Sequence, residues 1–133
     1  MKTNLLTLLI AVFFLGCTSS TSETPTYMIG AWNAKWETFA ESYPGVTDIK
    51  SFTMDGKWTF SDDGEITVAA YGFDGCIFGE DTIIHTQNWT VSNDTLNLIN
   101  NDQVHGMTYK IVSQSDDKIK LQLMKDIFVH LEK

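Results

Sequence analysis

Residues 57–68 read KWTFSDDGEITV and set the architecture expected for most of the chain. In each half of this stretch apolar residues alternate with polar ones, and neighbouring residues of a β-strand point to opposite faces. The centre, residues 61–64, holds the Ser, Asp and Gly typical of turns. The stretch therefore predicts two half-buried strands joined by a tight turn. The residues expected to point inward are Trp58, Phe60, Ile66 and Val68.

The same alternation continues on both sides of this hairpin. A turn is also expected at Asp55-Gly56, because Asp-Gly suits a two-residue type I′ turn, which needs positive φ. Residues 72–81 contain three glycines and predict a long loop, at the mouth of the fold. For the last strand the inward face stays open, since Phe128 and its neighbours are all apolar. The predicted strands are 31–40, 52–54, 57–60, 65–70, 82–91, 95–98, 107–111, 118–123 and 127–131.

Eight to nine short strands joined by tight turns predict an all-β, antiparallel up-and-down meander. A meander of this length is expected to close into a small barrel, because closure removes its unpaired edges. A barrel of about eight strands has room for packed side chains or for one small ligand.

The chain begins with the layout of an export signal: Lys2, an apolar run over residues 5–15, and Gly16 before Cys17. This order is typical of a secretory signal peptide, and the run is shorter than the about 20 residues that span a membrane. Phe14-Leu15-Gly16-Cys17 resembles a bacterial lipobox, which implies that Cys17 is acylated and becomes the new N-terminus. The alternative is an ordinary signal peptide with an incidental cysteine.

Three segments follow from these observations: a lipoprotein signal peptide over residues 1–16, a lipidated Cys17 with a flexible Ser/Thr-rich tether over 17–27, and a β-barrel domain over 28–133. We expect acyl chains on Cys17 to anchor the protein to a membrane, because several acyl chains together give stable attachment. Thr18 provides no acidic retention signal after the anchor, which favours the outer membrane of a bacterial envelope.

The charge of the chain excludes one class of partner. All nine basic residues are lysine, seventeen residues are acidic, and the formal net charge is −8. Because nucleic-acid binding needs a basic patch or stripe, we expect no nucleic-acid partner.

Gly30-Ala31-Trp32 resembles the G-x-W signature of lipocalins, and residues 55–66 and 89–96 resemble strands of compact bacterial lipocalin-like lipoproteins. The resemblance covers most of residues 28–132 and implies a barrel whose interior holds a small apolar ligand.

Lipocalins usually place an Arg over the Trp of this signature, and this chain has no Arg. That packing cannot be carried over, and the basic residues left to replace it are Lys125 and Lys133. The helix that lipocalins pack outside the barrel also has no counterpart in the sequence.

Several inward-facing residues are candidates for lining a ligand pocket, since such sites are mostly apolar with a few polar groups. The alternative is that the same aromatic side chains fill the barrel and leave no cavity. The candidate ligand-binding residues are Trp36, Trp58, Phe60, His85, Gln87, Trp89, His105 and Tyr109.

The sequence gives little support for metal binding, cofactor binding or catalysis. His85, His105 and His130 show no local metal-ligand spacing, and no cofactor motif is present, so we expect neither metal nor cofactor. The acidic residues cluster at turns, and Cys76 is expected to be a small buried hydrophobe; a catalytic loop around Cys76 is the least favoured alternative. We therefore expect no enzyme, but an envelope lipoprotein that binds a small, mainly apolar ligand. The alternative function is a periplasmic protein-interaction or inhibitor module with a filled barrel.

Overall fold

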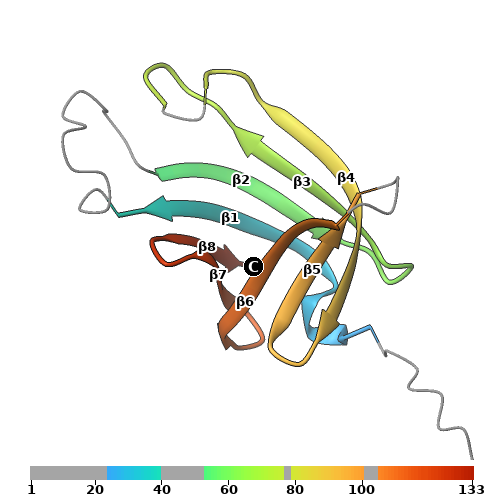
Figure 1. Cartoon of the computed structure of the whole chain (residues 1–133). Helices are drawn as coiled ribbons and strands as arrows, with labels where there is room; N and C mark the ends of the chain where they lie inside the picture. Colours follow the sequence, from blue (N-terminus) through green and yellow to red (C-terminus); the bar gives the residue numbers. More distant parts are fainter. Residues whose placement is uncertain (1–23, 40–52, 77–78, 101–104) are drawn as a thin grey trace, which may run out of the picture.

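The computed structural model describes residues 24–39, 53–76, 79–100 and 105–133. Within these ranges a short 3-10 helix, η1, leads into eight strands, and each strand pairs antiparallel with the next. β1 also pairs with β8, so the sheet closes into a barrel (Figure 1). The elements are η1 (Thr26–Met28), β1 (Gly30–Thr38), β2 (Thr53–Phe60), β3 (Glu65–Tyr71), β4 (Ile83–Ser92), β5 (Thr95–Ile99), β6 (His105–Gln114), β7 (Lys118–Met124) and β8 (Ile127–Glu132).

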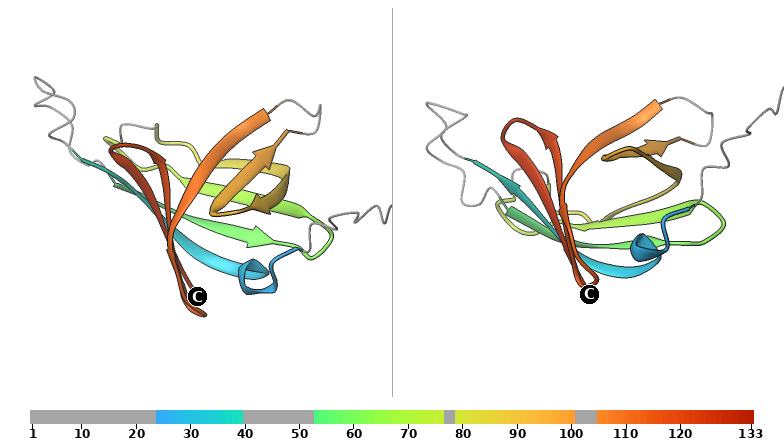
Figure 2. Two further views of the ribbon diagram at one scale, coloured as in Figure 1. Left: turned by 60° about the horizontal axis from the view of Figure 1, so that its bottom comes forward. Right: turned by 90° about the horizontal axis from the view of Figure 1, so that it is seen from below.

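The predicted all-β meander with barrel closure is confirmed. The two views of Figure 2 show the strands curling round so that β8 returns beside β1. Alternation along the strands places one face of each strand inside, as in β2, where every second residue from Gly56 to Phe60 is buried. Within the described ranges, no helix is long and apolar enough to cross a membrane. The predicted signal peptide and Cys17 lie outside these ranges.

The turn predicted at Asp55-Gly56 is wrong, because β2 runs straight through these residues. Gly56 pairs with Ala34 on β1 and with Ala70 on β3, and its φ is not positive. A Cβ on Gly56 would collide with the indole ring of Trp36 and with the backbone of the neighbouring strand. This glycine therefore makes room for a large side chain inside the barrel instead of turning the chain.

One end of the barrel is closed by η1 and Trp32, and we call it the closed end. Trp32 is fully buried, and its Nε1 donates a hydrogen bond of 2.7 Å to the backbone oxygen of Met28. Lys133 lies with its Nζ 4.5 Å from the centroid of the indole ring. Lys133 is thus the basic residue that covers this Trp, whereas Lys125 lies in the β7–β8 turn at the opposite end. Such a cation–π contact contributes about 0.5–1 kcal/mol at an exposed site.

The inward face of β8, which the sequence left open, holds Ile127, Val129 and Leu131, the last two fully buried. Phe128 points outward, where its ring meets Phe39 edge-on at 5.7 Å and lies under Lys120 Nζ. Phe128, the apolar residue that left the inward face of this strand ambiguous, therefore lies on the outer surface.

The connections differ between the two ends of the barrel. The turns at residues 61–64, 93–94 and 115–117 lie at the closed end, together with η1. The described residues of the β3–β4 loop, 72–76 and 79–82, lie at the other end, which we call the mouth. The loop predicted around residues 72–81 is confirmed for these residues, and 77–78 lie outside the described ranges.

The close contact at Gly56 predicts the effect of adding one methyl group. Gly56→Ala should lower the free energy of unfolding by about 1–3 kcal/mol, the usual cost of overpacking a filled interior. Chemical denaturation measures this, with Lys57→Ala on the outward face as the control, expected to change stability by less than about 0.5 kcal/mol. Equal stabilities of the two variants would contradict the packing described for Trp36.

Candidate ligand cavity at the mouth of the barrel

The closed half of the barrel is filled by aromatic side chains. Trp58, Phe60 and Trp89 are almost fully buried. The ring centroids of Trp58 and Phe60 lie 6.0 Å apart, and those of Phe60 and Trp89 lie 5.0 Å apart. Trp89 also donates from Nε1 to the backbone oxygen of Ser61 at 3.3 Å. These rings therefore form the core beneath any ligand site.

The mouth half of the barrel is hollow. Its cavity has a volume of about 280 Å³, close to the about 300 Å³ at which ordinary ligand pockets begin. It is also nearly twice the volume of an apolar cavity of about 150 Å³ that holds benzene. The cavity is lined by Trp36, Met54, Val68, Ala70, Ile83, His85, Met107, Tyr109, Leu123 and Ile127.

Three of the lining residues carry polar atoms in their side chains, namely Trp36, His85 and Tyr109, and the others are apolar. The Tyr109 hydroxyl donates to the sulfur of Met107 at 3.1 Å, and a thioether is a weak acceptor. Burial raises the pKa of Tyr109 to about 12, so this phenol stays neutral and remains a hydrogen-bond donor near neutral pH.

Trp58 lies behind the wall of the cavity and also carries a donor. Its ring centroid is 5.9 Å from that of Trp36 and 5.4 Å from that of Tyr109, and both of these residues line the cavity. Among the described residues, Trp58 Nε1 is buried without a hydrogen-bond partner. A buried donor without an acceptor costs free energy, and its presence calls for an explanation.

The cavity opens between β4 and β6. Ile83 and Met107 are 44% and 54% exposed, whereas Trp36 and Tyr109 on the deeper wall are 9% and 2% exposed. β5 pairs with β4 only from Asn88 onward, so the first half of β4 extends past β5. The described lining is therefore most exposed to solvent on this side.

The structure brings together three of the predicted ligand-binding residues, Trp36, His85 and Tyr109. It places Trp58, Phe60 and Trp89 in the filled half instead. Their contact with a ligand stays a prediction.

The remaining predicted residues do not line the cavity as it is described. Gln87 donates from Nε2 to Asn100 Oδ1 at 2.9 Å. His105 begins β6 opposite Ile99, and its side chain lies outside the described part of the structure. Cys76, expected to be buried, is a half-buried free cysteine in the β3–β4 loop.

Sequence reasoning missed the aliphatic and thioether part of the lining. The alternation places most of these side chains inside, but it does not tell a cavity-lining aliphatic side chain from one in the filled core. The missed residues are Met54, Val68, Ala70, Ile83, Met107, Leu123 and Ile127.

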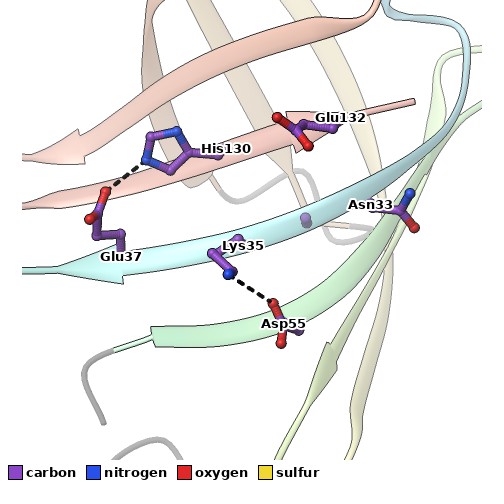
Figure 3. A pocket seen from close by; sticks show the side chains of 7 residues that line it. Asn33, Lys35, Glu37, Asp55, His130 and Glu132 are labelled. Carbon is purple, nitrogen blue, oxygen red and sulfur yellow. Dashed lines mark hydrogen bonds and ion pairs between the residues drawn. The ribbon is translucent and has the colours of Figure 1, made fainter.

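A larger groove of about 490 Å³ lies on the outer face of β1, β2 and β8 (Figure 3). Four of its side chains form two pairs: Glu37 Oε2 lies 2.8 Å from His130 Nε2, and Lys35 Nζ lies 4.0 Å from Asp55 Oδ1. Glu132 pairs with Lys118 at 2.8 Å. Exposed pairs of this kind contribute little to stability or binding. This groove is a solvated surface, and the interior cavity is the better candidate site.

Comparison with known proteins supports the fold. No family model matches the chain, and no curated protein does. An uncharacterized protein from Bacteroides eggerthii matches 80% of this chain over 98% of its own, with a TM-score of 0.52 and 12% identity. A lipocalin-like protein from Bacteroides uniformis matches with the same coverage, a TM-score of 0.49 and 12% identity. At such identities the likeness shows the fold alone, and the lipocalin-like architecture expected from the sequence is confirmed by the closed eight-stranded barrel itself.

The environment of Tyr109 predicts how stability responds to alkaline pH. An unfolded chain releases the phenolic proton near pH 10, whereas the folded protein holds it until about pH 12. The stabilisation is complete below pH 10 and is lost as the pH rises to 12, by up to roughly 2–3 kcal/mol. Denaturant unfolding at pH 9 and 11.5 measures the loss, and it should be smaller in Tyr109→Phe. Identical losses in the two proteins would refute the burial of this hydroxyl.

Proposed function

We propose that this protein binds a small, mainly apolar molecule in the mouth cavity and performs no catalysis. The observation that carries the proposal is the cavity of about 280 Å³ inside an otherwise filled barrel. Empty apolar space costs stability, so a hollow half beside a packed half favours a binding role. Its size suits a body of roughly one or two rings, judged against the cavity that holds benzene.

The proposal includes attachment to a bacterial envelope membrane through acyl chains on Cys17, with the outer membrane favoured by Thr18. It rests on the lipobox-like residues 14–17. The chain enters the barrel through η1 at the closed end. An anchor at Cys17 would therefore attach opposite the mouth, which leaves the cavity open to the aqueous side.

A second candidate function is a protein-interaction or inhibitor module. Apolar side chains are exposed around the mouth, at the ends of β1, β3 and β7 and in the β3–β4 loop: Phe39, Tyr71, Phe73 and Met124. Exposed apolar patches of this kind mark surfaces for protein partners. Under this function the cavity would be incidental, so filling it should not affect the partner.

Filling the cavity tests the ligand-binding proposal. Ala70→Phe places a ring in the cavity, whereas Ala69→Phe places the same ring on the outer face of the same strand. A neutral two-ring dye such as 1-aminonaphthalene, titrated by its own emission, should bind at least about tenfold more weakly to Ala70→Phe, because the ring occupies its volume. Ala69→Phe should bind like the original chain. Equal binding by all three proteins, or none by any, would end the proposal.

Anchoring is tested by separating membranes from soluble protein in a bacterial host. Cys17→Ser removes the only cysteine among residues 1–75 and should move the protein from the membrane fraction to the soluble one, because no acyl chain can be attached. Cys76→Ser is the matched control and should remain with the membrane. Membrane association of Cys17→Ser would show that acylation there is not the anchor.

A further inference from the structure

We infer that the ligand is a neutral, compact apolar molecule that carries a hydrogen-bond-accepting oxygen, such as a ketone, ester or ether. This inference rests on the proposed function and specifies its ligand class. It follows from the Tyr109 hydroxyl at the inner wall of the cavity, whose acceptor is a thioether, and from the absence of Lys, Asp and Glu in the described lining.

The donor is the Tyr109 hydroxyl. Tyr109 lines the cavity and is almost completely buried, yet among the described residues its hydroxyl reaches only the thioether of Met107. An oxygen acceptor forms a stronger hydrogen bond with a phenol than a thioether does. Met107 lies at the exposed side of the cavity, so its flexible side chain can move aside when a ligand oxygen arrives.

Trp58 packs behind the inner wall of the cavity. Its ring centroid lies 5.9 Å from that of Trp36 and 5.4 Å from that of Tyr109. Its Nε1 is buried without a partner in the described structure, and Trp58 does not itself line the cavity. The ligand oxygen therefore meets the Tyr109 hydroxyl, and this contact replaces a weak hydrogen bond with a stronger one.

Charged ligands fit this wall poorly. No Lys, Asp or Glu lines the described cavity, and His85 lies on its exposed side. A carboxylate on the inner wall would lose its hydration without an opposite charge, which is costly. An ammonium group would face the Tyr109 hydroxyl and no anionic acceptor, and only two of the ten lining residues, Trp36 and Tyr109, offer aromatic rings for a cation–π contact.

A set of ligands on one bicyclic skeleton tests the inference: decalin, 2-decalone, decalin-2-carboxylate and 2-decalylammonium. Each competes with 1-aminonaphthalene for the full-length protein. We expect 2-decalone to bind about threefold to tenfold more tightly than decalin, the gain of one neutral hydrogen bond, and both charged compounds to bind more weakly than decalin. The ratio of the decalin to the 2-decalone dissociation constant should fall to about one in Tyr109→Phe.

The carbonyl stretch of bound 2-decalone gives a second readout. Its infrared frequency should fall on binding, and this shift should shrink in Tyr109→Phe, which loses the hydroxyl but keeps the ring. Equal affinity for decalin and 2-decalone, or tighter binding of a charged compound, would overturn the ligand class and leave the binding function standing. If the protein binds the dye but none of the four decalin compounds displaces it, the ligand class is overturned as well. If the dye itself does not bind, the binding function is overturned.

Discussion

Closure of the sheet through β1 determines how the interior of this barrel is arranged. β1 pairs with β2 from Gly30 to Glu37 and with β8 from Asn33 to Thr38, so its backbone groups are satisfied on both sides. An unclosed meander would expose the edges of β1 and β8 to other chains. Closure also fixes which side chains share the interior, because a slip of one residue would turn every inward side chain outward.

The register then divides the interior into a filled half and a hollow half. Pairing sets Trp32 opposite Trp58 and Gly30 opposite Phe60, so the largest side chains gather at the closed end. Toward the mouth the inward positions include Gly56 and Ala70, which are small. Trp36 uses the space over Gly56, and the rest of that volume remains as the cavity. Hollow space at the mouth thus follows from where small residues fall along paired strands.

Much of the fold could be predicted from alternation, since the period of two survives in nearly every strand. The site could be predicted only in part, because alternation gives the face of a residue but not its height along the barrel. His85 and Trp89 share a face of β4, yet pairing puts Trp89 in the closed half and His85 at the cavity. The turn predicted at Gly56 is wrong for a related reason. The local sequence favours a turn, but a glycine is needed at this position because the ring of Trp36 packs against it.

Ligand binding at this site requires a cavity that is apolar, accessible and empty enough to receive a ligand. Xenon enters such cavities without needing a hydrogen bond, so a crystal structure under xenon pressure probes this property alone. We expect a xenon atom in van der Waals contact with Trp36 and Val68, inside the mouth half of the barrel. A barrel interior without xenon, or with ordered water at that place, would contradict it.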